Sequence, residues 1–385
     1  MNSFAYQYPV KVRFGDRIAK DSLAEELKNY GKNVLLAYGG GAIKRVGIYD
    51  EIISVLKEAG KNVIEFSGIM PNPTYAKVQE GAEIAKENDV DFILAVGGGS
   101  VIDCCKIVSA QARLDEDIWD LEYAKGGQPT DFIPMGAVVT SFGTGAEMNN
   151  GAVITNTDKM MKSPLWGAFY DFAVLDVDYT MTMPLKQVIS GSFDTLSHCM
   201  ETYFGTPRET NLSDEINEAV MRNVIRNMRM TLKDPTDRFV RSELIWAAAM
   251  GENGVLKLGK ITDFQCHMLE HQLGAYTDCN HGFGLAVIHP VLYRHIYQEN
   301  IAQFAKLAVN VWGVDPDGKT ESETALAGIS ALADFIKEMG LPTTFNEMNI
   351  TDTDFKAIAD STIITAGCAK KLSKEELLEI LEECK

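Results

Sequence analysis

Basic residues are scarce in this sequence relative to acidic ones. The 385 residues include 36 lysines and arginines against 54 aspartates and glutamates, which gives a formal net charge of −18. Nucleic-acid phosphates and anionic membrane surfaces both attract basic protein surfaces. The charge therefore argues against nucleic acid and against membranes as partners.

Long apolar runs and paired cysteines are also missing. No apolar run approaches the length of a membrane span, and residues 1–15 contain no apolar core of signal-peptide length. The seven cysteines form no CxxC pair. Because an odd number of cysteines without a secretion signal favours reduced thiols, we expect a cytoplasmic protein.

The first half of the sequence alternates short β-rich runs with amphipathic segments. Strands are expected at residues 33–38, 62–66, 91–96, 133–140, 152–155 and 172–175. Helices are expected at residues 43–59, 74–87 and 101–112. This βαβαβα order predicts a mainly parallel, Rossmann-like sheet covered by helices, and thus an α/β dinucleotide-binding domain over residues 1–183.

After Pro184 the pattern changes, and no convincing strand follows. Valine, isoleucine and glycine become less frequent, and the apolar residues recur with helical periodicity. Helices are expected at residues 185–204, 211–232, 237–250, 261–275, 296–312, 321–339, 352–361 and 373–384. Residues 184–385 are therefore predicted to form an all-helical domain.

A glycine-rich turn follows one of the predicted strands and opens a helix. It consists of Gly97, Gly98, Gly99 and Ser100. Glycines let a backbone approach a phosphate closely, and a helix N-terminus offers free N–H donors. The spacing is neither GxGxxG nor a P-loop, so a plain strand-to-helix turn explains the motif equally well. Asp103 in the first turn of that helix either caps N–H groups or accepts a bond from a ribose hydroxyl or another loop.

Two further loops of small residues follow predicted strands. Residues 140–147 (TSFGTGAE) are rich in hydroxyl groups and would suit a phosphate or a nicotinamide. In the other loop, Gly39–Gly41, no acidic residue is available for the 2′-hydroxyl of NAD, while Lys44 and Arg45 follow shortly. This composition favours NADP(H) over NAD(H).

Four residues in the second half form a candidate metal site. Asp194 and His198 are four apart in a predicted helix, so their side chains share one face. His267 and His281 bracket a second predicted helix and the loop after it. One carboxylate and three imidazoles suit zinc or ferrous iron. His289 and His295 show no such pattern and are interpreted as structural or surface residues.

Four segments carry a family resemblance. They are GGGSVID at 97–103, TSFGTGAE at 140–147, AVLDVDYTMTMPLKQVISGSFDTLSHCMETY at 173–203 and HMLEHQLGAYTDCNHGFG at 267–284. In these segments the chain resembles the iron-containing (group III) alcohol dehydrogenases, in particular butanol dehydrogenases and NADPH-dependent aldehyde reductases. The resemblance covers essentially the whole chain.

The resemblance implies roles for individual residues. It makes Asp194, His198, His267 and His281 the metal ligands, and His271 a nearby histidine that relays a proton. The implied cofactor-binding residues include Gly39 and Gly40, together with Asn72, Gly98, Gly99, Ser100, Asp103, Thr140, Ser141, Thr144, Asn149, Gly151, Lys162 (with Lys159 as an alternative) and Tyr179. It also implies a homodimer.

The implied chemistry is the interconversion of primary alcohols and aldehydes. A metal would polarise the substrate oxygen while a nicotinamide supplies or accepts the hydride. One alternative within the same fold is a polyol dehydrogenase or a cyclising lyase that uses NAD transiently. Another is a zinc protease, since residues 267–271 match H-x-x-E-H, with Glu270 as the base. The donor set does not decide the native metal.

Overall fold

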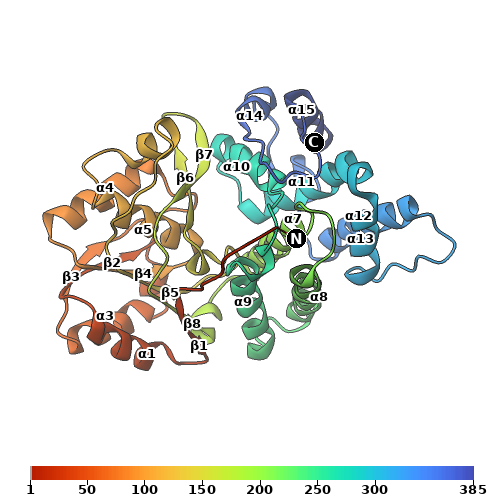
Figure 1. Ribbon diagram of the computed structural model, residues 1–385. Helices are drawn as coiled ribbons and strands as arrows, with labels where there is room; N and C mark the ends of the chain where they lie inside the picture. The colour runs from red at the N-terminus through yellow and green to blue at the C-terminus, as the bar shows by residue number, and fades with distance from the viewer. Residues whose placement is uncertain (1) are drawn as a thin grey trace. The chain divides into compact units, whose positions relative to one another are not determined.

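A six-stranded sheet lies at the centre of the N-terminal half of the chain. The computed structural model describes residues 2–385. Every strand pairing in this sheet is parallel, in the order β1-β8-β5-β4-β2-β3 (Figure 1). The strands are β1 (Lys11–Gly15), β2 (Asn33–Tyr38), β3 (Asn62–Phe66), β4 (Phe92–Gly97), β5 (Met135–Val139) and β8 (Phe172–Asp176). The arrangement confirms the predicted Rossmann-like α/β fold.

Helices cover both faces of this sheet. On one face lie α1 (Ala19–Glu26) and α3 (Ile48–Glu58), whose apolar side chains pack on β2 and β4 in a continuous core. On the other face lie α4 (Tyr75–Glu87) and α5 (Gly99–Gln111) (Figure 1). The single helix expected at residues 43–59 is interrupted, because Gly47 adopts a left-handed φ of 82° between α2 (Ala42–Arg45) and α3.

Two strands differ from the sequence-based expectation, since the pattern predicts neither β1 nor β7 (Met161–Trp166). β1 is an edge strand with basic side chains, and this weakens its apolar pattern. β7 contains Pro164, which argues against a strand but is tolerated in a two-stranded hairpin with β6 (Gly151–Asn156). The strand expected at residues 152–155 therefore belongs to this hairpin and not to the main sheet.

The sheet has a topological switch point between β2 and β4. From β2 the chain moves outward to β3, then returns to the opposite side of β2 for β4. The helices that follow β2 and β4 cover opposite faces. In open α/β sheets, ligands bind at the carboxyl ends of the strands beside such a point. The loops that leave β2 and β4 there are Gly39–Gly41 and the turn at Gly98.

The second half of the chain is helical, as predicted. After α6 (Val177–Thr180), its helices are α7 (Leu185–Tyr203), α8 (Leu212–Lys233), α9 (Arg238–Glu252), α10 (Gln265–Thr277), α11 (His281–Ile296), α12 (Ile301–Asn310), α13 (Glu321–Glu338), α14 (Phe355–Ser361) and α15 (Lys374–Glu383). None of the helices in residues 2–385 is both long and apolar enough to cross a membrane.

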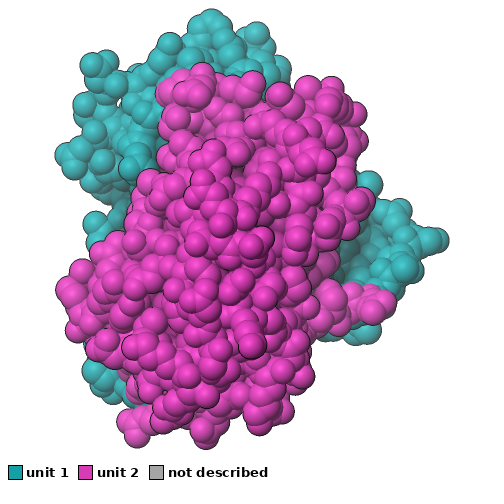
Figure 2. Space-filling view, turned by 90° about the vertical axis from the view of Figure 1, so that its left-hand side faces the viewer, with its two compact units in different colours: residues 1–6, 185–385 teal, residues 7–184 magenta. Residues whose placement is uncertain are grey.

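The described chain divides into two compact units, which Figure 2 colours separately. One is Gln7–Pro184, and the other is Leu185–Lys385 together with residues 2–6. The N-terminal residues thus belong to the helical unit, in contrast to the predicted domain of residues 1–183. The reason is local bonding: the Asn2 N–H donates to the Gly259 carbonyl, and the Tyr6 hydroxyl donates to the Asn253 carbonyl.

Among the helices of residues 2–385, α11 is the one long helix that the sequence pattern does not predict. Gly282, Gly284 and Pro290 lie within it, and all three are poor helix formers. The helix forms nevertheless because nearly all of its apolar side chains are buried in the helical unit. Tertiary packing outweighs local preference here.

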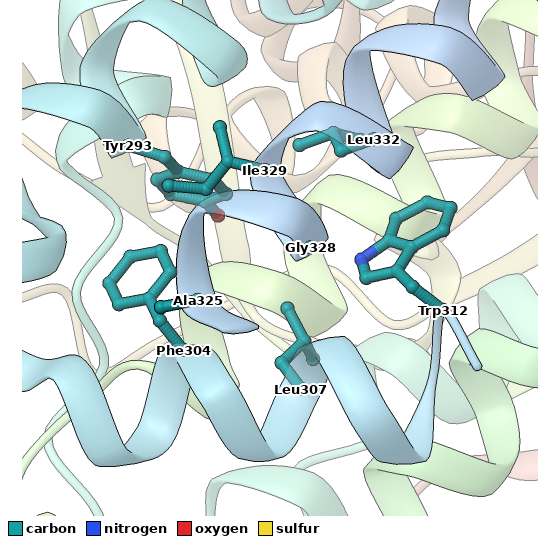
Figure 3. A pocket seen from close by; sticks show the side chains of 8 residues that line it. All are labelled: Tyr293, Phe304, Leu307, Trp312, Ala325, Gly328, Ile329 and Leu332. Carbon is teal, nitrogen blue, oxygen red and sulfur yellow. The ribbon is translucent and has the colours of Figure 1, made fainter. Parts of the chain in front are cut away.

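The core of the helical unit is closely packed. Where α12 and α13 approach, a Cβ at Gly328 would lie 2.5 Å from the Ala308 Cβ. Beside this contact, Tyr293, Phe304 and Trp312 line a cavity of about 10 Å³ together with α13 side chains (Figure 3). The cavity has room for at most one water molecule. It contains none of the predicted site residues and is a packing defect of the core.

Candidate metal centre and cofactor loops

Asp194 lies in the middle of α7, a helix that is buried along most of its length. His267 is in the first turn of α10, and His281 is the first residue of α11. The Nε2 atoms of both histidines lie 3.4 Å from the Oδ1 atom of Asp194. Two ligands at ~2.1 Å from a tetrahedral ion are separated by about 3.4 Å. The three side chains are thus spaced as ligands of one ion.

Unsatisfied polar atoms support the same interpretation. Asp194 Oδ1 and His267 Nε2 are buried and have no hydrogen-bond partner among the described residues. Buried polar atoms are normally paired, since an unpaired one loses its hydration without compensation. One potential ligand atom from each of Asp194, His267 and His281 lies within 4.8 Å of the others. These residues fit a divalent cation.

His198, the fourth predicted ligand, lies beside this group but less close to it. Its Nδ1 is 3.9 Å from Asp194 Oδ1, and its ring stacks on that of His267 with centroids 4.5 Å apart. The His198 Nδ1 is buried and has no hydrogen-bond partner within residues 2–385. The structure therefore brings three of the four predicted ligands together and places His198 next to them.

Two carboxylates that the sequence analysis does not assign to the site lie behind the histidines. Glu201 on α7 contacts the Nδ1 of His267, and Glu270 on α10 contacts the Nδ1 of His281. Both carboxylates are buried. A signal existed in the sequence: Glu201 lies one helical turn beyond His198, and Glu270 lies between His267 and His271. Neither spacing distinguishes such a contact from an ordinary helix face.

The position of Glu270 also bears on the protease alternative. In an H-x-x-E-H protease the glutamate must reach a water molecule on the metal. Here the Glu270 side chain has no solvent exposure and is occupied by His281. Glu270 is therefore placed to support a histidine and not to act as a base toward a peptide.

The electrostatics of the site favour a bound cation. Burial alone would raise the pKa of the Asp194 carboxyl, but the imidazoles of His198, His281 and His267 hold it well below its ordinary value. Burial lowers the pKa of His198. For His267 and His281 burial acts in the same direction, but Glu201 beside His267, Glu270 beside His281, and Asp194 beside both outweigh it and raise the pKa of each. Protons and a metal ion thus compete for the same Nε2 atoms.

The remaining histidines fall into two groups. His271 is buried on α10, and its ring lies 5.5 Å from that of His281 and 6.0 Å from that of His267. It is therefore within the site. His289 is buried against Ser197, with 2.6 Å between Nε2 and Oγ, and His295 contacts Glu383 near the chain end.

Most of the predicted cofactor residues lie at the carboxyl edge of the sheet. They occupy the loop after β2 (Gly39, Gly40), the turn after β3 (Asn72), the β4–α5 turn (Gly98, Gly99, Ser100) and the loop after β5 (Thr140, Ser141, Thr144). A Cβ at Gly98 would lie 2.9 Å from the Ser141 Cβ, and one at Gly99 would lie 2.5 Å from the Thr144 Oγ1. The two loops thus touch through glycine, and α5 begins in this turn. The N-terminus of a helix is a favourable place for a phosphate. These residues fit a dinucleotide.

Asp103, Asn149 and Gly151 are joined by a residue that the sequence analysis missed. The Lys106 ammonium, fully buried on α5, donates to Asn149 Oδ1 at 2.9 Å and to Asp103 Oδ1 at 3.4 Å. It also donates to the Gly151 carbonyl at 2.5 Å. The other oxygen of Asp103 accepts the Val153 N–H of the hairpin at 2.9 Å. A lysine in an apolar helix carries no sequence signal for such a role.

The last two predicted residues are more deeply placed. Lys162 is buried on β7, whereas its alternative, Lys159, is exposed in the turn of the hairpin. Tyr179 follows β8 and packs in the core between the sheet and the α1–α3 face. In contrast to these two buried residues, Gly40 is exposed to solvent, and a Cβ there would meet no atom within 4 Å.

A parallel sheet with glycine loops at its switch point and a buried carboxylate–imidazole group on helices are the features expected of a metal- and nucleotide-dependent oxidoreductase. Comparison with known proteins makes the class specific. Residues 9–177 match the family "Iron-containing alcohol dehydrogenase", and residues 188–384 match "Fe-containing alcohol dehydrogenase family, C-terminal". The chain belongs to the iron-containing alcohol dehydrogenase family.

Individual relatives are similar over nearly the whole chain. The chain is 41% identical to the probable NADH-dependent butanol dehydrogenase 1 of Bacillus subtilis, over 99% of each chain. It is 33% identical to the NADPH-dependent aldehyde reductase of Escherichia coli, over 93% of this chain and 92% of that one. The crystal structure of NADH-dependent butanol dehydrogenase A from Thermotoga maritima matches with a TM-score of 0.94 and 33% identity, over 100% and 99% of the two chains. The chain is accordingly an NAD(P)-dependent oxidoreductase that acts on alcohols and aldehydes.

Proposed function

We propose that this enzyme interconverts aldehydes such as butanal with the corresponding primary alcohols, using a divalent metal held by Asp194, His198, His267 and His281. The observation that carries the proposal is the placement of two imidazole Nε2 atoms 3.4 Å from one carboxylate oxygen. The relatives named as butanol dehydrogenases support the choice of a short aliphatic substrate.

Each part of the site has a distinct task in this proposal. When bound, the metal supplies Lewis-acid polarisation of the substrate oxygen, and the nicotinamide supplies or accepts the hydride. Asp194 contributes negative charge to hold the cation, and the imidazoles complete the donor set. Burial of Asp194 and His267 excludes water from one side of the reacting oxygen.

His271 is proposed to move the proton to and from the substrate oxygen. It lies four residues after His267 on the same face of α10, and its ring packs against that of His281. An imidazole in this position can exchange a proton near neutral pH, directly or through a water molecule.

We propose that the enzyme favours NADP(H). Gly39–Gly41 places no carboxylate where NAD-preferring dinucleotide sites hold the 2′-hydroxyl. Lys44 follows on α2, although its ammonium is 3.3 Å from Glu65 Oε2 and is thus partly neutralised. The names of the relatives do not agree on the cofactor: the Bacillus subtilis protein is named for NADH and the Escherichia coli protein for NADPH.

A single variant tests this preference. Gly40→Asp introduces a carboxylate at an exposed position that has free space. The native enzyme is expected to have a higher kcat/KM with NADPH than with NADH, and the variant to reverse the order because the carboxylate repels a 2′-phosphate. A native preference for NADH would contradict the proposal.

A cytoplasmic homodimer is also proposed. The family resemblance supports the dimer. None of the seven cysteines forms a disulfide within residues 2–385, and this supports a reducing compartment. Size-exclusion chromatography with light scattering measures the mass of the protein in solution and thereby tests the dimer. A mass near the 42.4 kDa of one chain would overturn the proposed dimer.

The proposed activity is tested by following nicotinamide absorbance with butanal. Oxidation of NADPH that is lost on chelation and restored by ferrous iron or zinc is the expected result. Asp194→Ala should remain inactive after metal is returned. Undiminished activity in the chelated enzyme or in that variant would refute the metal-assisted mechanism.

A further inference from the structure

Two of the histidines in the proposed metal centre have a carboxylate on the far side of the ring. His267 faces Asp194 with its Nε2 and Glu201 with its Nδ1. His281 repeats the arrangement with Asp194 and Glu270. An imidazole has only these two polar atoms, so contacts at both ends fix the rotation of the ring as well as its position.

Glu201 is itself firmly held. Its Oε1 accepts the Cys266 N–H at 2.6 Å and the His267 N–H at 3.3 Å, at the first turn of α10. The other oxygen, Oε2, contacts the His267 ring. The carboxylate on α7 thereby orients both the backbone and the side chain of His267.

Glu270 is held by close packing. Its side chain is fully buried, and its Oε1 accepts a weak bond from the Cys279 thiol at 3.7 Å. A Cβ at Gly284 would lie 2.8 Å from the Glu270 Cγ and 3.0 Å from its Oε1. Glycine at position 284 on α11 therefore leaves the space that the Glu270 carboxylate occupies beside His281.

Together these contacts link three helices. Glu201 and Asp194 project from α7, Glu270 and His267 from α10, and His281 from α11. Each neighbouring pair is joined by at least one carboxylate–imidazole contact. His198 presents its other ring nitrogen to the carboxylate, since its Nδ1 lies 3.9 Å from Asp194 Oδ1.

We propose that Glu201 and Glu270 are positioning residues that orient His267 and His281 for metal binding. Each carboxylate accepts the Nδ1–H of its histidine, so the neutral ring presents the Nε2 lone pair toward Asp194. The inference rests on the proposed metal centre and adds to it the residues that arrange it in advance.

The experiment measures the affinity of the enzyme for Zn²⁺ by competition with a chelator. In Glu201→Ala and Glu270→Ala, loss of the carboxylate should weaken binding by about 10–100-fold. Glu201→Gln and Glu270→Gln keep an acceptor oxygen and should recover part of this affinity. Gly284→Ala should also weaken binding, because the added methyl group displaces the Glu270 side chain while both carboxylates remain.

Glu218→Ala is the matched control. Glu218 is a buried carboxylate of the same unit, where it contacts the Tyr203 hydroxyl and Asn310 but no histidine. Its removal should lower thermal stability and leave Zn²⁺ affinity unchanged. The visible spectrum of the Co²⁺-loaded enzyme gives a second readout, since its bands should shift in the Glu201 and Glu270 variants and not in the Glu218 variant.

The outcomes separate this inference from the proposed centre. Native Zn²⁺ affinity and an unchanged Co²⁺ spectrum in the Glu201 and Glu270 variants, with loss of metal in Asp194→Ala, would overturn the positioning role and leave the centre intact. Equal Zn²⁺ binding by the native enzyme and by Asp194→Ala would refute the proposed metal centre itself. If an alanine variant does not fold, the glutamine variants and Gly284→Ala decide the question by the same two readouts.

Discussion

The two functional regions of this molecule are built in different ways. The candidate metal centre is made of side chains from helices, and Asp194 and His267 within it are buried. The cofactor loops are made largely of backbone at the ends of strands, where Gly98, Gly99 and Ser100 are half-exposed. A metal ion needs specific donor atoms, whereas a phosphate needs N–H groups and space. The first region therefore depends on which side chains are present, and the second on which are absent.

The largest expected effect is the loss of a ligand from the metal centre. His267→Ala removes an Nε2 that faces Asp194, and His198→Ala removes the imidazole beside it. Both variants should purify without metal and without measurable aldehyde reduction, while their affinity for NADPH is kept. Elemental analysis and cofactor titration measure the two properties; full metal occupancy in His198→Ala would exclude that residue from the ligand set.

A smaller effect is expected when the metal remains and proton transfer is impaired. His271→Ala should retain metal and lose on the order of 10²-fold or more in kcat, the usual scale for a general acid or base. The pH profile of kcat should lose one of its limbs. Unchanged kcat with an unchanged profile would assign His271 a packing role beside His281.

Substitution of a cofactor-loop glycine should weaken cofactor binding and leave the metal in place, in contrast to the metal-ligand variants. At Gly99 an added methyl group would lie 2.5 Å from Thr144 Oγ1 and 3.1 Å from its Cβ, so the loops must move apart. Gly99→Ala should weaken NADPH binding on the order of tenfold, about 1.4 kcal/mol, with full metal content. Gly251→Ala is the control, because its methyl group would make only ordinary contacts at 3.8 Å.

Lys106 offers a test of how far the cofactor region depends on a buried charge. Lys106→Met removes the ammonium that joins Asp103, Asn149 and Gly151. Fluorescence titration should show weaker NADPH binding, and the midpoint of thermal unfolding should fall. Lys260→Met removes a buried ammonium paired with Asp214 in the helical unit, and should lower stability without a change in cofactor affinity. Equal cofactor affinity in both variants would refute the role of Lys106.

The last expected effect concerns pH and stability in the helical unit, with no direct effect on metal or cofactor binding. Burial and the nearby charge of Glu201 raise the pKa of Asp263 to about 7. Hydrogen bonds from the Ala369 and Gln265 N–H groups and from Cys368 act in the opposite direction but are outweighed. The folded state therefore holds this proton more tightly than the unfolded state. The stabilisation that this proton gives to the folded state is fully present below about pH 4, near the ordinary pKa of Asp. It is lost as the pH rises through the folded-state pKa of Asp263.

Urea unfolding of native enzyme and Asp263→Asn between pH 5 and pH 8 measures this contribution. The native enzyme should lose more stability over that range than the variant, which has no proton to release at this position. Parallel pH dependence in the two proteins would show that Asp263 is already ionised in the folded state.

The contrast between the two regions also explains what the sequence can predict. The β2 and β3 strands follow from unbroken β-rich runs, and Asp194, His267 and His281 follow from residue types that few structural positions require. β1 and α11 are missed because an edge strand and a glycine-containing buried helix owe their form to tertiary packing. Glu201, Glu270 and Lys106 are missed for a similar reason: charged residues on helices are ordinarily solvent-facing, and only the fold reveals that these are buried.

The most direct test of the central claim is the position of the metal itself. Crystals of the enzyme loaded with Fe²⁺ or Zn²⁺ should give, at the absorption edge of that metal, a single strong anomalous peak. We expect the peak within bonding distance of Asp194 Oδ1 and of the Nε2 atoms of His267 and His281. A loaded enzyme that shows no peak at Asp194, or a peak at other residues alone, would contradict the account.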